Sequence, residues 1–188
     1  SRIKAGGAVT ISATNTVVSN ALADGNILGA AGAAVAVSNV YGDTTASIVD
    51  QAAVSTTNLN LTAMSKREVT TLANSTPGGS KAPASGKNQS QSVLEDSKAK
   101  TAEGKSVDVV GAVAINAIAG KTSSFVASTG TIGVFESAAS INISATTISS
   151  SITKADGHFT DSGSTGVGVA VAISTAKLDS LSYVGNQS

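Results

Sequence analysis

The only histidine of the chain, His158, lies in the segment ADGHFTDSG, close to Asp156 and Asp161. An imidazole beside two carboxylates could serve as an acid/base pair or bind a metal ion. A single histidine is a weak signal for catalysis. We therefore expect a solvated histidine in a turn built on Asp156–Gly157, and the sequence predicts no metal and no cofactor.

Carboxylates could also cleave polysaccharides, because glycosidases use paired acids and some parallel β-helices act on polysaccharides. The 12 acidic residues are scattered along the chain, and only Glu95 and Asp96 are adjacent. Tryptophan, which stacks on sugar rings, is absent. We expect no enzymatic activity, with a carbohydrate-active lyase or hydrolase as the alternative.

Three short polar segments are expected to have structural rather than catalytic or metal-binding roles. Residues 24–26 (DGN) and 41–45 (YGDTT) are expected to form ordinary turns, because the tandem Gly/Asp repeats and the loop spacing of calcium sites are absent. Ser65–Glu68 (SKRE) directly follows an expected strand. We expect a solvated strand end there, whose charges discourage pairing with another sheet edge.

A long polar segment, residues 75–106, is the best candidate for binding. It contains both prolines of the chain and many of its charges, a composition typical of loops. Ser92 could cap a short helix over residues 93–105. Loops on rigid scaffolds often carry binding, although long surface insertions are also tolerated at little cost. The candidate binding residues are Lys81, Lys87, Glu95, Asp96, Lys98 and Lys100.

Composition excludes several kinds of partner. The chain has 188 residues, a net charge of zero and no cysteine, so we expect no nucleic-acid binding and no disulfide. Its longest apolar run, Val109–Ala119, is too short for a membrane helix, so we expect no membrane insertion in this segment. The chain lacks an initial Met and a signal segment, and we interpret it as a fragment of a larger protein.

Two short motifs recur, and both predict strands. The first motif is VTISAT (Val9–Thr14), LNLTAM (Leu59–Met64) and INISAT (Ile141–Thr146), in which apolar and mainly polar residues alternate. Such alternation predicts one buried face and one solvated face.

The second motif alternates alanine with a branched residue. It occurs at Ala34–Ser38, Ala112–Asn116 and Ala170–Ser174. Both faces are small and apolar, which is typical of a strand covered on both sides. Small side chains would also let neighbouring layers approach closely.

The spacing of the two motifs indicates the fold. Their alanines Ala13, Ala36 and Ala63 are separated by 23 and 27 residues, which is the length of one coil of many parallel β-solenoids. We therefore predict an all-β chain: one parallel β-helix or β-solenoid over residues 1–188, with a long loop inserted at 75–106. An antiparallel β-sandwich is the alternative, because alternation alone does not fix strand direction.

The AVA[VI][NS] strands and the tract VYGDTTASIVDQAAVSTTNLNLTA resemble the repeats of large secreted bacterial surface proteins, the autotransporter passengers and haemagglutinin-like adhesins. The resemblance covers most of the chain outside residues 75–106. It implies a β-solenoid at the cell surface or secreted, and a role in adhesion or as a stalk. It assigns no catalytic or binding residue.

Together these features predict a non-catalytic structural or adhesion module that binds, if at all, through loops on a rigid solenoid. The expected partner is a glycan or protein on a host or neighbouring cell. An oligomerising stalk unit, whose apolar AVAVS faces pack between chains, is a further alternative. The sequence leaves the oligomeric state open.

Overall fold

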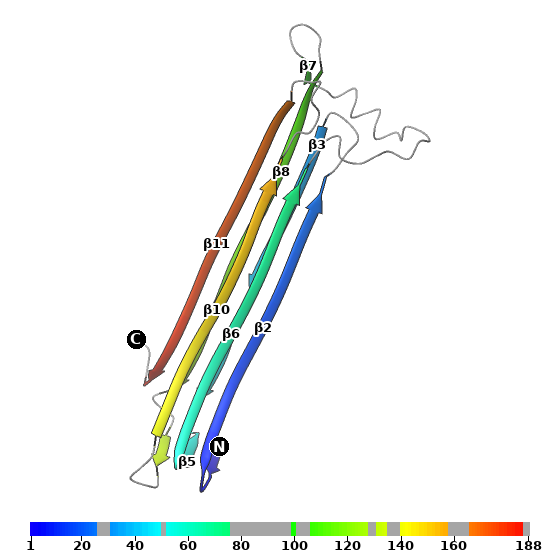
Figure 1. The fold of residues 1–188 in the computed structure, drawn as a ribbon. Coiled ribbons are helices and arrows are strands. Elements are labelled where there is room, and N and C mark those ends of the chain that lie inside the picture. Colours follow the sequence, from blue (N-terminus) through cyan, green and yellow to red (C-terminus); the bar gives the residue numbers. More distant parts are fainter. Residues whose placement is uncertain are drawn as a thin grey trace.

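The computed structural model describes residues 1–25, 31–49, 52–75, 99–100, 106–127, 131–134, 140–157 and 166–185. These residues are almost entirely β-strand, and none of them is helical. The prediction of an all-β chain is confirmed. The long strands run side by side along an elongated body, and both termini lie near one end of it (Figure 1).

The strands form three sheets, here named A, B and C. Sheet A is short and contains β1 (Arg2–Lys4), β5 (Ala53–Thr56) and β9 (Thr131–Val134). Sheet B contains β2 (Ala8–Asp24), β6 (Asn58–Asn74) and β10 (Ser140–Asp156). Sheet C contains β3 (Ala31–Tyr41), β4 (Thr44–Ile48), β8 (Ser106–Val126) and β11 (Gly166–Val184), while β7 (Ala99–Lys100) pairs with β8.

Nearly all of the pairing is parallel. The chain visits sheets A, B and C in that order, and does so three times. Among the described strands the exception is β7, which pairs antiparallel with the start of β8. The antiparallel sandwich is therefore wrong, because each strand of sheets A, B and C lies beside a strand that runs in its own direction.

Each motif stacks on its own copies. Ala13, Ala63 and Ala145 of the first motif align in sheet B, and Ala36, Ala114 and Ala172 of the second align in sheet C. The step from Ala13 to Ala36 therefore leads from one sheet to the next. Our interpretation of that step as a whole coil is wrong: residues that align across β2 and β6, such as Ala13 and Ala63, lie 50 positions apart.

The first motif buries its apolar side chains and exposes its polar ones, as predicted. Leu59, Leu61 and Ala63 point into the core, and Thr10, Ser12 and Thr14 of the neighbouring strand point to solvent. Hydroxyl and amide side chains form rows across the outer face of sheet B, and Asn58 accepts a hydrogen bond from the Ser140 hydroxyl over 2.9 Å. In these rows each polar side chain lies next to a polar side chain of the neighbouring strand.

The core changes character along the strands. Where the three sheets meet, aliphatic residues such as Leu59, Leu61 and Ile48 fill the space. Near the other end sheets B and C enclose a cluster whose buried apolar residues are all alanine, including Ala73, Ala112 and Ala114. Sheets that share an alanine layer lie closer than the spacing of about 10 Å usual for packed sheets.

The second motif corrects our prediction of strands covered on both faces. Its alanines point inward, and Ala112 and Ala114 have no exposed surface. Its branched residues point outward, and Val35 and Val37 remain 61% and 59% exposed. The inner alanines pack against alanines of sheet B, including Ala73. Nothing in the described structure covers the outer face.

Candidate functional site

The candidate binding loop lies mostly outside the described residues. This applies to Lys81, Lys87, Glu95, Asp96 and Lys98, and to the side chain of Lys100. The loop leaves sheet B after Ser75, which is fully buried, and returns at β8 of sheet C. Ala99 and Lys100 pair with Val107 and Ser106, so a short antiparallel ladder holds its return at the start of β8. The short helix expected over residues 93–105 is wrong at Ala99–Lys100, which are strand, and its other residues lie outside the described part.

Four exposed aspartates of the described residues lie in two rows. Asp24 and Asp156 flank Asn74 at the end of sheet B, on either side of its middle strand. Asp43 and Asp179 flank Lys121 in sheet C in the same way. Within the described ranges no three His, Cys, Asp or Glu side chains could hold one metal ion. Glu95, His158 and Asp161 lie outside those ranges.

The expected turn at YGDTT is wrong. Tyr41 pairs with Ala119 and Thr44 with Thr122, so β3 and β4 follow β8 in one unbroken register. Gly42 and Asp43 interrupt a single strand. The Asp43 carboxylate accepts a hydrogen bond from the Lys121 backbone over 2.7 Å, which fastens the interruption to β8. Asp24 is the last residue of β2, and Asn26 of the DGN segment is not described.

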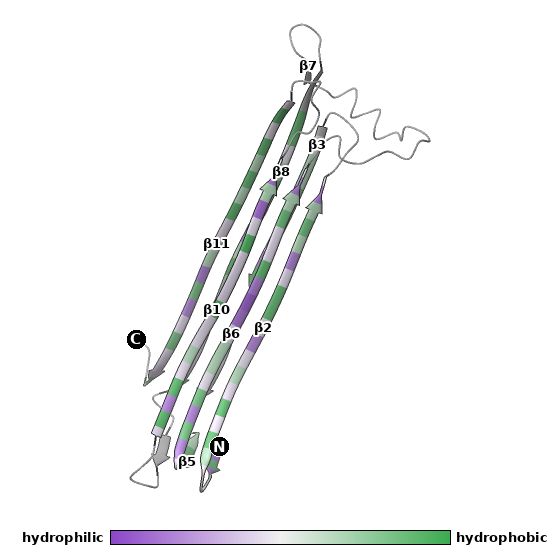
Figure 2. Cartoon of the chain, in the orientation of Figure 1, coloured by the Kyte–Doolittle hydropathy of each residue, from purple (hydrophilic) through white to green (hydrophobic). Residues whose placement is uncertain are grey.

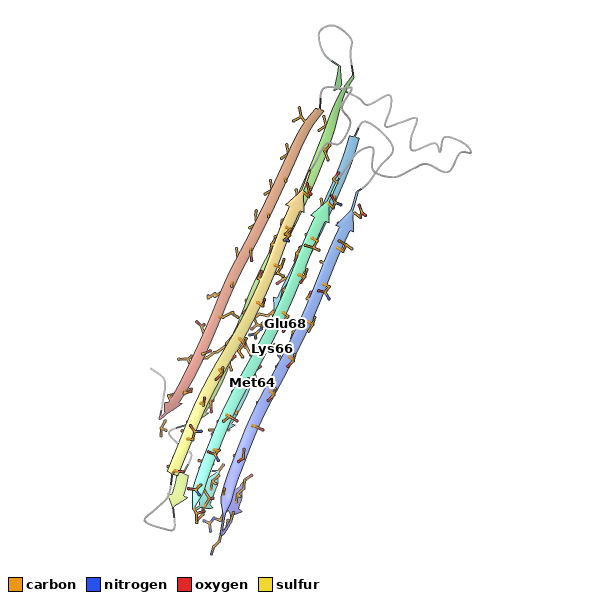
Figure 3. All side chains as sticks on the ribbon, viewed as in Figure 1. Met64, Lys66 and Glu68 are labelled. Carbon is orange, nitrogen blue, oxygen red and sulfur yellow. The ribbon has the colours of Figure 1, made fainter. Side chains whose placement is uncertain are left out.

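Ser65–Glu68 is not a strand end, because these residues lie in the middle of β6. The alternation that buries Leu61 and Ala63 continues through them, so Ser65 and Arg67 point inward. Lys66 and Glu68 point outward beside Met64 (Figure 3). Extending the period-two pattern beyond Ala63 would have identified the buried arginine from the sequence.

Arg67 has no exposed surface, which is rare for an arginine. Its Nη2 donates a hydrogen bond to the Gly42 carbonyl oxygen of the facing sheet, while Nε and Nη1 have no partner in the described structure. Space for the guanidinium comes from Gly42 and Gly120, which oppose each other where β8 passes the interruption. Within the described residues Arg67 forms no ion pair.

Hydroxyl and amide groups surround this arginine along the interior. Thr147 donates to Thr122 over 2.7 Å, and Asn116 donates to Ser151 over 2.6 Å, each bond joining sheets B and C. Ser19 and Ser38 make a similar contact at 2.9 Å. Sheets B and C are thus joined by polar contacts between the aliphatic and the alanine parts of the core.

The Lys66–Glu68 ion pair should contribute little to stability. Its atoms are 2.7 Å apart, and both side chains are about half exposed. Solvent screening limits such pairs to about 0–1 kcal/mol. We expect Glu68→Gln to change the free energy of unfolding, measured by chemical denaturation, by less than about 1 kcal/mol. A larger loss would contradict the solvent-exposed placement of this pair.

An open recess of about 610 Å³ lies where β1, β4 and β5 meet. Its lining includes Ile3, Ile48 and Val54, together with Ser1 and Ser47. None of the lining residues carries a side-chain acid or base.

The described residues include no helix of the length and hydrophobicity needed to cross a bilayer. No protein-family profile, curated protein or solved structure matches this chain.

Proposed function

We propose that the chain is a segment of a parallel β-solenoid that serves as a non-catalytic structural or adhesion module, secreted or exposed on a bacterial surface. The observation that carries the proposal is the triple passage through sheets A, B and C, with each strand stacked on its own motif. Three parallel sheets visited in constant order are the arrangement that a solenoid requires.

The pattern of side chains supports the proposal. Polar rows such as Thr10–Asn60–Asn142 let sheet B face water without a high net charge. The long loop begins where β6 ends. A binding segment at that position would project from a rigid support. The resemblance to adhesin repeats supports the same proposal.

The partner we propose is a glycan or protein on a host or neighbouring cell, bound through the loop residues Lys81, Lys87, Glu95, Asp96, Lys98 and Lys100. The test is binding of the intact chain to an array of glycans and matrix proteins. A second version replaces residues 77–98 with a short Gly/Ser linker and keeps β7, whose pairing with β8 anchors the loop. A third keeps the loop length and changes Lys81, Lys87 and Lys98 to Gln.

We expect the intact chain to bind a member of the array and both altered versions to lose at least about tenfold in affinity, as removal of a central contact does. Circular dichroism and thermal melting would show that the altered versions remain folded. Equal binding by all three would place the site elsewhere. Release of oligosaccharides from a polysaccharide panel would overturn the non-catalytic proposal, and binding by none of them would overturn the adhesion role.

A further inference from the structure

The outer face of sheet C carries a continuous apolar surface, whereas polar and charged residues interrupt the apolar ones on the outer face of sheet B. We define the apolar patch as the outward residues at the start of β3, β8 and β11. They align in rows across the sheet: Val109 and Val167, then Ala33, Gly111 and Val169, then Val35, Val113 and Val171, then Val37, Ile115 and Ile173.

Exposure of these side chains is high. Val169 and Ile173 are 52% and 45% exposed, in addition to Val35 and Val37. Green, the apolar colour, recurs along the upper part of β11 in Figure 2, whereas purple marks the middle of β6. On sheet B the exposed apolar residues Val18, Leu22 and Ile152 lie in rows that also carry Glu68, Lys154 and Thr70. A contiguous exposed apolar surface that continues over three strands is often an interaction site.

The size of the patch can be compared with that of an interface. With rows about 7 Å apart and strands about 4.8 Å apart, four rows on three strands cover roughly 400 Å². A specific interface takes about 800 Å² from each partner, with an apolar centre and a polar rim. The rows that follow, Asn39–Ala117–Thr175 and Tyr41–Ala119–Lys177, continue the same flat face and would supply that rim.

We propose that the apolar patch binds the same patch of a second copy of this chain, so that two copies of sheet C pack face to face about a two-fold axis. A flat β-branched surface is complementary to itself, and sheets pack in this way in β-sandwiches. The patch contains no charge, so self-contact brings no like charges together. It lacks the lysines that nucleic acids require and the basic and aromatic residues typical of membrane surfaces.

The test measures the mass of the complete chain in solution by light scattering and sedimentation over a wide concentration series. We expect a dimer for the natural chain. Val35→Lys with Ile173→Lys places charges in the patch on β3 and β11. The matched control, Val18→Lys with Ile152→Lys, alters residues on β2 and β10 of sheet B that are equally exposed, at 61% and 48%.

The patch variant should weaken dimerisation by about 100-fold or more, because it buries uncompensated ammonium groups, while the control should dimerise like the natural chain. Melting curves of both variants would verify folding. A natural chain that stays monomeric at every concentration overturns the proposal. Association that survives the patch variant also overturns it and would point to the strand edges. Binding of the natural monomer to lipid vesicles through the patch overturns it as well. These outcomes are independent of glycan binding.

Discussion

Replacing Gly120 by alanine is expected to lower the free energy of unfolding by about 3 kcal/mol, a cost typical of strong overpacking. Gly120 has a φ of +155°, a backbone conformation that side chains rarely adopt. A β-carbon there would overlap the Gly42 carbonyl oxygen of the neighbouring strand and lie 2.5 Å from Nη2 of Arg67. The backbone of sheet C and the buried guanidinium would both have to move.

The matched control is Gly111→Ala in the same strand, β8. A β-carbon at Gly111 would meet nothing within 4 Å. We expect the control to change stability by less than about 0.5 kcal/mol, as surface substitutions usually do. Urea denaturation of the two variants beside the natural chain measures the difference. Equal stability of the two variants would show that Gly120 does not face a crowded site.

Arg67→Ala is expected to destabilise the chain by about 3 kcal/mol, whereas Arg67→Met should remain within about 1 kcal/mol of the natural protein. Alanine would leave a cavity between sheets B and C and remove the donor to the Gly42 carbonyl. Methionine would fill much of the same space. It would also remove the cost of burying a cation whose Nε and Nη1 lack partners.

The comparison of the two Arg67 variants separates volume from charge. Denaturant unfolding with both variants gives the free energies, and the slopes show whether the unfolding remains a single transition. If methionine were as damaging as alanine, the hydrogen bond to Gly42 and the polar contacts nearby would matter more than the filled space. If neither change had an effect, the side chain would not be buried in solution.

Strand formation could be predicted from single motifs. In Leu59, Leu61 and Ala63 the period of two, together with apolar side chains, defines a strand and its buried face without reference to the rest of the chain. The same rule, applied four residues further, places Arg67 inside. Lys66 and Glu68 made the segment resemble a charged surface, and the charges hid the regular alternation.

Partner choice between strands could not be predicted from spacing. Ala13 and Ala36 are neighbours along the chain but belong to different sheets, and Ala13 instead aligns with Ala63. Which strands pair depends on how the turns between sheets place them side by side. The residues of those turns carry no clear sequence signal in this chain. The loop candidates Lys81 to Lys100 remain a prediction from composition.

The sequence by itself determined the class of the fold, the strands and the inward face of the first motif, because a strand's two faces alternate by covalent geometry. Only the tertiary structure decided which face of the second motif is buried. Val35 and Ala36 are both apolar, so alternation cannot choose between them. Packing against sheet B decides: Ala36, Ala112 and Ala114 form a buried cluster with Ala73, and Val35 is left outside.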